Sequence, residues 1–479
     1  MMTQTTTRKT IAIIGGGVSG ALTAYHLVQQ RAEARILVID PRPELGLGLA
    51  YSTPSLRHLL NVPAGKISAL PNQPEHFLHW LRANYDPEAN RGTFAPRAVF
   101  GMYIRDLLAT VDGVEQVRAT VVDYRAAVAG AVLTLDDGRR IACDLAVLAT
   151  GNFDPAVLPG ISDEARSTNA YCHNAWLSAT YEKLNPDAPV TLIGSGLTAV
   201  DVLLRLRELG HRGTITAASR HGILPNRHSD YTPMTESAIP SDTPATCIAY
   251  LRALRSAIRN GAEWRAAFDS LRATTNDLWL ALPLAEQKRF RRHLQRRWDV
   301  VRHRMAPPVA DIIESELAAG TLIVRVGHLH SVGATTKGAA VVIRTASGEE
   351  KFESARVINC TGPSMNYRRV KSPLLESLFE QGLVAPGPLG GGFNTTRSGA
   401  LIDARGQASG VLFNLGPARL GTLLESIAIP ELREQAVELA TILVGILVGL
   451  LSTMRSSRQE EDQQSSLSTT AELGSLVAA

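Results

Sequence analysis

The chain has 479 residues, of which 45% are hydrophobic and 20% are charged. This length exceeds one hydrophobic core of ordinary size, and the composition is that of a globular protein, so we expect two domains with extensions. The net charge of +4 is too small for a dedicated nucleic-acid binder, and no nucleic-acid partner is expected.

Residues 10–40 have the pattern of a strand, a glycine-rich turn, a helix and a second strand. The expected strands are 10–14 and 35–39, and the expected helix is 18–30. Gly15, Gly17 and Gly20 form GxGxxG, which permits a tight turn, close approach to a pyrophosphate and close helix packing. The helix N-terminus stabilises phosphate, and Asp40 is expected to bind ribose hydroxyl groups. We therefore predict an FAD site that also includes Ser19 and Arg42.

A second glycine-containing loop, Glu-Leu-Gly-Leu-Gly-Leu-Ala-Tyr, occupies residues 44–51. Glycine is favoured where a ligand leaves no room for a Cβ atom, so Gly48 is predicted to lie against the FAD. A plain turn is the alternative interpretation. Gly48 is therefore a candidate cofactor-binding residue.

The same kind of unit returns at residues 190–218, with expected strands 190–193 and 213–218 and an expected helix 198–209. Its turn carries Gly194, Gly196 and Ala199 at the motif positions, with Thr198 beside them. Ser219 occupies the position equivalent to Asp40 and is followed by Arg220. An acidic residue there would repel the 2′-phosphate of NADPH, whereas serine and arginine side chains can bond to that phosphate. We predict an NADPH site; an arginine on a solvated loop is the alternative.

Two apolar strands, within 144–151 and 356–362, each end in Thr-Gly. Such strands occur where a chain passes between an FAD domain and an inserted NAD(P)H domain. We predict an α/β fold with two Rossmann-like domains, comprising 1–160 and 351–435 for FAD and 161–350 for NAD(P)H. The candidate cofactor-binding residues at these strand ends are Thr150, Gly151, Thr361 and Gly362.

The segment 410–421 is expected to be a strand and a glycine-rich turn that contains Gly416 and Gly421, followed by a helix from about Thr422. The N-terminus of such a helix can stabilise negative charge on a reduced flavin. Both glycines are therefore predicted to bind cofactor. A plain strand-to-helix turn is the alternative.

Residues 289–304 contain seven arginines, with Trp298 among them. Helical spacing spreads their charges around the axis, which favours a solvated face. The alternative is an anion site for a substrate carboxylate or a nucleotide phosphate, because arginine matches planar anions. This segment is the best candidate for substrate specificity within the 161–350 domain.

Cysteine and histidine spacing excludes other site types. The cysteines Cys143, Cys172, Cys247 and Cys360 form no CxxC pair, which argues against a redox dithiol beside the flavin and fits a cytoplasmic protein. The histidines show no metal-ligand spacing, so no metal is expected. No residue is assigned a catalytic role.

The C-terminal part changes character. Residues 439–451 are almost wholly apolar but too short to span a bilayer, so we expect a docked helix at 436–455. Gly445 and Gly449 have the spacing that permits close helix packing, and peripheral membrane contact is left open. A disordered tail is expected at 456–479. The oligomeric state is not predicted.

The chain resembles the bacterial FAD/NAD(P)-binding protein family over about residues 10–440. The stretches that carry the resemblance are His58–Pro63, which contains Asn61, then Pro74–Leu81, Phe94–Arg97, Trp298–Asp299, Arg302–Pro307 and Glu425–Pro430. The segment 144–152 is more distantly similar to the ATG motif of flavin-dependent N-hydroxylating monooxygenases, although Asn152 replaces their usual aromatic residue. The resemblance implies FAD and NADPH, and adds Asn61 to the expected cofactor-binding residues.

Three functions are compatible with these features. In the first, NADPH reduces the flavin, which then uses O₂ to oxygenate a small nitrogen- or heteroatom-containing substrate. In the second, a dehydrogenase or electron-transfer oxidoreductase uses the same cofactors without oxygen insertion. In the third, the protein is a flavin-dependent redox sensor that binds a partner through residues 436–479 and has no enzymatic activity. The order given is the order in which the sequence favours them.

Overall fold

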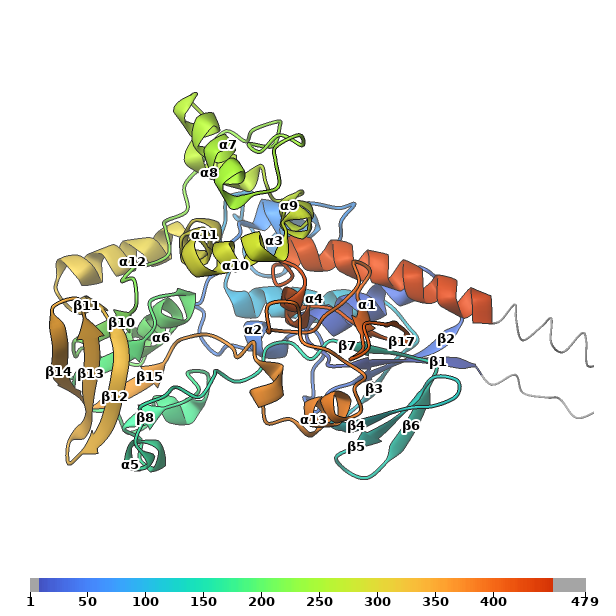
Figure 1. The fold of residues 1–479 in the computed structure, drawn as a ribbon, viewed down its shortest axis with the longest axis horizontal. Coiled ribbons are helices and arrows are strands. Elements are labelled where there is room, and N and C mark those ends of the chain that lie inside the picture. Colours follow the sequence, from blue (N-terminus) through green and yellow to red (C-terminus); the bar gives the residue numbers. More distant parts are fainter. Residues whose placement is uncertain (1–7, 451–479) are drawn as a thin grey trace, which may run out of the picture.

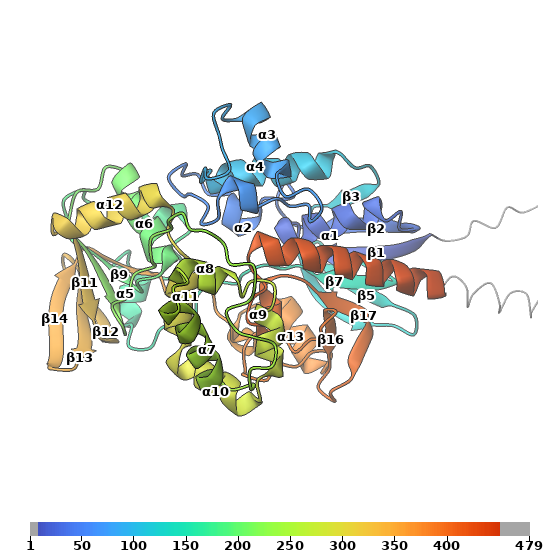
Figure 2. The ribbon, with the colours of Figure 1, turned by 90° about the horizontal axis from the view of Figure 1, so that it is seen from above.

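The computed structural model describes residues 8–450. These residues form a mixed α/β fold with two parallel sheets at opposite ends of its long axis (Figure 1). Helices α7–α11, which lie within residues 247–302, are on one side of the region between the sheets (Figures 1 and 2). The expected tail at 456–479 lies outside the described residues.

The first sheet joins strands from both ends of the chain. Its order is β16-β17-β7-β1-β2-β3, and only the β16–β17 pair is antiparallel. The strands are β1 Lys9–Ile14, β2 Ala34–Ile39, β3 Val114–Val117, β7 Leu145–Leu148, β16 Ala400–Ile402 and β17 Ala408–Asn414. The apolar runs of β1, β2 and β7 are buried, as expected for a parallel sheet covered on both faces.

The second sheet is built from the middle of the chain and is parallel throughout. Its order is β11-β10-β9-β15-β8. The strands are β8 Tyr171–Cys172, β9 Val190–Ile193, β10 Ile215–Ser219, β11 Leu322–Val326 and β15 Arg356–Asn359. The expected boundary at 350 falls before β15, so this sheet continues to Asn359. The domain division itself stays a prediction.

Two antiparallel three-stranded sheets lie beside the parallel ones, in the orders β4-β5-β6 and β12-β13-β14. The first comprises β4 Val121–Ala126, β5 Ala131–Leu135 and β6 Arg140–Cys143. The second comprises β12 His328–Thr335, β13 Gly338–Thr345 and β14 Gly348–Ser354.

The helices outside α7–α11 connect or cover the sheets. They are α1 Val18–Gln29, α2 Gly48–Tyr51, α3 His76–Asn84, α4 Arg97–Ala109, α5 Asp163–Ser167, α6 Leu197–Glu208, α12 Pro307–Ala318 and α13 Pro373–Glu380. Short 3₁₀ turns occur at Ala64–Lys66, Ser178–Thr180, Tyr367–Arg369 and Pro417–Gly421. Proline at the start of α12 and α13 is favourable because the first helical amide has no partner within the helix.

Five helices lie between β10 and α12, and α12 leads into β11. They are α7 Cys247–Arg259, α8 Trp264–Asp269, α9 Thr275–Ala281, α10 Leu284–His293 and α11 Gln295–Arg302. Thr246 begins α7 by accepting a hydrogen bond from the Ala249 amide at 3.2 Å, which is typical helix capping. The expected helical Arg/Trp segment thus forms α10 and α11.

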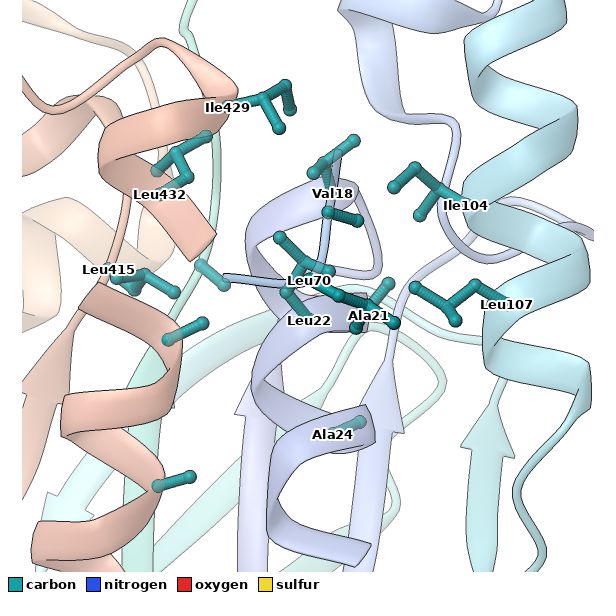
Figure 3. Packing of buried hydrophobic residues seen from close by; sticks show 14 of the residues in the cluster. Val18, Ala21, Leu22, Ala24, Leu70, Ile104, Leu107, Leu415, Ile429 and Leu432 are labelled. Atoms are coloured by element: carbon teal, nitrogen blue, oxygen red, sulfur yellow. The ribbon is translucent and has the colours of Figure 1, made fainter. Parts of the chain in front are cut away.

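The last described helix runs from 429 to 450 and packs on α1. Figure 3 shows α1 between α4 and this helix, with Val18 and Leu22 of α1 close to Ile429 and Leu432. The prediction of a helix from Thr422 is therefore wrong, and so is a start at 436. Residues 422–428 are held as a loop by Glu425 and Ser426, and Pro430 favours a helix start at this point. Among residues 8–450, no helix combines the length and the hydropathy needed to cross a bilayer.

Candidate functional site

The turn between β1 and α1 requires its glycines. Gly15 has a φ of +108°, and a Cβ atom there would lie 2.3 Å from the Ala149 carbonyl oxygen. A Cβ atom on Gly20 would lie 1.9 Å from the Gly15 carbonyl oxygen. Gly20 thus permits close packing of helix and turn, while the amides at the start of α1 remain directed at a possible phosphate.

Asp40, at the end of β2, orients the same turn. Its carboxylate accepts a hydrogen bond from the Gly16 amide at 2.7 Å and two from the Arg42 guanidinium at 3.0 and 2.8 Å. Burial opposes the charge of Asp40, but these bonds outweigh that cost and lower the pKa of Asp40. Asp40 therefore remains ionised and fixes Arg42. Its expected contact with a ribose stays a prediction.

A first cavity, of about 510 Å³, opens at this turn. Its volume is in the range of small-molecule and cofactor sites. The predicted cofactor-binding residues that line it are Gly15, Gly17, Ser19, Asp40, Arg42, Gly48, Thr150 and Gly151. The structure thus brings together residues from the turn, the 44–51 loop and the end of β7.

The two glycines after β17 have different surroundings. Gly416, with a φ of +98°, lies over the first turn, where a Cβ atom would be 2.7 Å from Ser19 Oγ. The next residue, Pro417, lines the first cavity. Gly421 instead packs against another loop, where a Cβ atom would lie 2.2 Å from the Phe393 carbonyl oxygen. Gly421 does not line the first cavity, and close backbone packing accounts for this glycine.

The turn between β9 and α6 is built in the same way. Gly194 has a φ of +122°, and a Cβ atom there would lie 2.5 Å from the Cys360 carbonyl oxygen at the end of β15. Ala199 is buried in the packing of α6. Thr361 donates a hydrogen bond to Asn359 Oδ1 at 2.7 Å, which fixes the turn after β15. Thr361 and Ala199 therefore shape the backbone of the turn.

A second cavity, of about 490 Å³, opens at this turn. The predicted residues that line it are Asn61, Gly196, Thr198 and Gly362. Three residues, Ala50, Tyr51 and Ile427, line both the first and the second cavity. Ligands bound at the two turns would therefore meet at these side chains.

Ser219 and Arg220 lie at the edge of the second turn. The hydroxyl groups of Ser219 and Ser195 are hydrogen-bonded at 2.8 Å, and the Gly222 amide donates to Ser219 Oγ at 3.0 Å. Arg220 is exposed to solvent. Ser219 thus already has partners within the protein, and neither residue lines the second cavity.

Arg296, on α11, was not singled out individually from the sequence. Its Nη2 atom donates to the Ser195 carbonyl oxygen and hydroxyl, each at 3.2 Å, and Nη1 would lie 3.7 Å from a Cβ atom on Gly196. Burial lowers the pKa of Arg296, and the positive charge of Arg220 lowers it further. The positive charges of Arg220 and Arg296 thus interact at the second turn. The only sequence signal for Arg296 was its place among the seven arginines of 289–304.

An ion pair in the wall of the second cavity connects α4 to α6. Arg97, at the start of α4, lies with Nη2 2.7 Å from Asp201 Oδ2, and both residues line the cavity. The His58 ring is 2.9 Å from the Asp201 carbonyl oxygen. Segments around residues 58 and 97, which carry part of the family resemblance, therefore hold the two halves of the structure in contact.

A third cavity, of about 520 Å³, lies next to the second. The two share the lining residues Asn61, Val62, Asp299, His303, Arg304, Ile427 and Ala428. Six Lys or Arg side chains line the third cavity against three carboxyl side chains. The cations are Lys66, Arg272, Arg291, Arg302, Arg304 and Arg433, and the carboxyl groups belong to Asp269, Asp299 and Glu425. This excess of positive charge suits an anionic ligand.

Arg302 and Arg304 are buried, so the expectation of a solvated arginine face is wrong for these two residues. Arg302 is ion-paired with Glu425, and Arg304 is hydrogen-bonded to Asp269. Buried guanidinium groups need such partners because desolvation of an unpaired charge is costly. The pattern of 289–304 could not reveal this, since the partners lie far away in the sequence.

Asp299 and His303 lie where the second and third cavities meet. Burial raises the pKa of Asp299, against a hydrogen bond from Gln295 at 2.6 Å and the charge of Arg296. Burial lowers the pKa of His303 to about 4. His303 is therefore neutral at pH 7. Asp299 ionises less readily than an aspartate exposed to solvent.

The four cysteines do not line the first, second or third cavity. Cys143, Cys247 and Cys360 are buried, and none of the four cysteines forms a disulfide. Burial raises the pKa of Cys143 to about 12 and that of Cys247 to about 11, so both are protonated at neutral pH. Within residues 8–450 no group of His, Cys, Asp and Glu side chains could hold a metal ion.

Residues 12–153 match the sequence model of the FAD-NAD(P)-binding family. This segment contains the end of β1, the first glycine turn and β7. The protein therefore carries an FAD/NAD(P)-binding domain, in agreement with the predicted nucleotide cofactors.

A curated relative, the uncharacterized protein YdhS of Escherichia coli strain K12, is 27% identical over 256 residues. The aligned region is 45% of this chain and 46% of YdhS, so the match spans about half the length of the relative.

Two solved structures have a similar fold. The ornithine N-hydroxylase KtzI of Kutzneria sp. 744, solved with reduced FAD, NADP⁺ and L-ornithine, has a TM-score of 0.62 at 14% identity. The alignment covers 91% of this chain and 98% of KtzI. The bacillithiol disulfide reductase of Bacillus cereus has a TM-score of 0.54 at 15% identity and coverage of 91% and 99%. At these identities the likeness concerns the fold alone, which both a monooxygenase and a reductase adopt.

Proposed function

We propose that the protein binds FAD in the first cavity and NADPH in the second, and oxidises a small molecule bound in the third. In this proposal the second parallel sheet and its helices form an NAD(P)H domain inserted in an FAD domain. The match of residues 12–153 to an FAD-NAD(P)-binding family supports the first assignment. The repeated strand, glycine turn and helix at β9 and α6 supports the second.

The position of Ile427 carries the proposal. Ile427 lines all three cavities, and 43% of this large apolar residue is exposed. An apolar side chain at such a junction excludes water from the region where flavin, nicotinamide and substrate would meet. Bound FAD supplies the redox chemistry, and the protein orients the ligands and keeps the junction dry.

Arg296 and Arg220 support NADPH over NADH. A 2′-phosphate bound near β10 would face two guanidinium groups and no carboxylate at the end of the strand. Charge-assisted hydrogen bonds of this kind are the strong ones. To bind the phosphate, Arg296 would have to release one of its present backbone partners, such as the Ser195 carbonyl oxygen. Arg296 lies on α11 and not on the β9–α6 turn itself, so its side chain can move without a change in that turn.

Among the possible reactions, we propose oxygenation of a small nitrogen- or heteroatom-containing substrate by O₂. The thiols support this choice over disulfide reduction, because none of the four cysteines lines the first or second cavity. The fold shared with an ornithine N-hydroxylase agrees with it. The excess positive charge of the third cavity supports a substrate that also carries an anionic group. Dehydrogenation without oxygen insertion is the second candidate, because all three cavities are equally suited to it.

The oxygen step separates these two reactions. The FAD-loaded protein is reduced with NADPH without oxygen and then mixed with oxygenated buffer, with and without a panel of amino acids and other acidic amines. Oxygenation predicts a transient flavin absorbance spectrum that differs from those of reduced and oxidised flavin, and a product heavier by one oxygen atom. Direct return to oxidised flavin with hydrogen peroxide and no product for the whole panel would favour the dehydrogenase.

A further inference from the structure

A fourth cavity, of about 250 Å³, lies within the helical segment and has no part in the proposed reaction. It is enclosed by α7–α11, and only one of its lining residues, Leu424, also lines the third cavity. We call it the helical cavity. None of the residues that line the helical cavity belongs to either glycine turn. The two proposed dinucleotides therefore do not account for this cavity.

The walls of the helical cavity are apolar and aromatic. Phe268, Phe290 and Trp298 form a chain of ring contacts, with centroids 5.8 Å apart for Phe268 and Trp298 and 6.1 Å for Phe290 and Trp298. Leu251 and Leu278 complete the wall and are only partly buried. Apolar side chains around an unfilled space lose packing contacts, so an apolar ligand that fills the space would stabilise this segment.

Two arginines give the helical cavity a polar edge. Arg255 on α7 and Arg297 on α11 line it, and both are exposed to solvent. Neither guanidinium has an ion pair or a hydrogen bond within residues 8–450, and no Asp or Glu is among the lining residues. An apolar interior with free cations at the edge matches a molecule that has an apolar chain and one anionic group.

We infer that the helical cavity binds an anionic amphiphile, with its apolar chain among Phe268, Phe290 and Trp298 and its carboxylate or phosphate at Arg255 and Arg297. This inference is independent of the proposed reaction, because the site shares no lining residue with the first or second cavity. The chain could come from a free acid or from a membrane lipid. The exposed face of α7 carries Arg252, Arg255 and Arg259 and could itself attract an anionic membrane surface. The experiment must therefore distinguish a free acid from a membrane lipid.

Calorimetric titration of the full, FAD-loaded chain tests the inference. The probes are decanoate below its micelle-forming concentration, decyl phosphate, and decanol as an uncharged chain of the same length. We expect both anions to bind, and decanol to bind about 10-fold more weakly, because it lacks a charge-assisted hydrogen bond. The double variant R255Q/R297Q should weaken decanoate binding by about 10-fold or more and leave decanol unchanged.

Two further variants locate the site. L251F adds volume to the wall and should weaken all three probes, provided that its circular dichroism and FAD content equal those of the wild type. R259Q is the matched control, because Arg259 lies on the same helix but does not line the cavity. It should bind decanoate like the wild type.

Three results would overturn the inference. The first is absence of decanoate binding. The second is equal binding of decanoate by the wild type and R255Q/R297Q. The third is binding of anionic phospholipid vesicles, titrated in the same way, without binding of decanoate, where R259Q weakens vesicle binding as much as R255Q/R297Q does. This result would place the interaction on the outer face of α7 instead of in the cavity.

Discussion

Arg302 donates two hydrogen bonds to Glu425, from Nε to Oε1 at 2.6 Å and from Nη2 to Oε2 at 2.7 Å. Both residues are buried, and the pair joins α11 to the loop before the last described helix. Burial lowers the pKa of Arg302, but the bonds and charge of Glu425 more than reverse this and raise it. The pair thus fixes one wall of the third cavity.

The substitution E425Q should lower the free energy of unfolding by about 3–5 kcal/mol, because it leaves Arg302 with too little compensating charge in a buried site. Urea unfolding followed by circular dichroism measures this change. The control R212Q breaks the exposed Arg212–Asp187 pair and should cost about 0–1 kcal/mol. Equal effects of the two substitutions would contradict the described role of the buried pair.

Gly20→Ala should prevent FAD binding. The new Cβ atom would lie 1.9 Å from the Gly15 carbonyl oxygen, so the helix and the turn must move apart. We expect purified G20A to contain little or no flavin by absorbance. Gly410→Ala is the matched control, since a Cβ atom there meets no atom within 4 Å. Wild-type flavin content in G20A would show that the first turn does not hold the cofactor.

Arg296→Gln should raise KM for NADPH by about 10- to 100-fold, because it removes charge-assisted hydrogen bonds to the 2′-phosphate. KM for NADH should change little. Steady-state oxidation of both nucleotides provides the measurement, and R292Q, at an exposed position of α10, is the control. A similar rise for NADH would instead assign Arg296 to a part common to both nucleotides.

Stability should fall as the pH decreases from about 6.5 towards 4. Burial lowers the pKa values of His26, His228 and His303 to about 4, whereas the unfolded chain takes up protons near pH 6.5. Between about pH 4 and pH 6.5 the unfolded state therefore binds more protons than the folded state. The contribution of these histidines to the free energy of unfolding is fully present only above about pH 6.5. Urea unfolding at pH 7.5 and pH 5.0 measures the loss, and H228F should reduce it. Equal stability at the two pH values would contradict the burial of these rings.

The local parts of the fold were predictable from the sequence. The prediction placed β9 at the observed residues, and the ends of α1 differed by one residue at most, because glycine turns and apolar runs act over short distances. Most of the predicted residues around the first turn also line one cavity.

The long-range parts were not predictable. The burial of Arg302 depends on Glu425, and the place of Arg296 depends on how α11 packs on the second turn. Neither relation leaves a periodic pattern in one segment of sequence. Gly421 shows a related ambiguity, since a need for close backbone packing and a need for ligand contact both favour glycine. Its role in cofactor binding stays a prediction.

In the proposed function, two dinucleotides bind side by side and NADPH passes a hydride to FAD. Anaerobic mixing of the FAD-loaded protein with NADPH or NADH, with flavin absorbance recorded over time, tests it most directly. We expect rapid reduction with a clear preference for NADPH, and much slower reduction by NADPH in R296Q. Failure of both nucleotides to reduce bound flavin in the wild type would contradict the assignment of the second cavity.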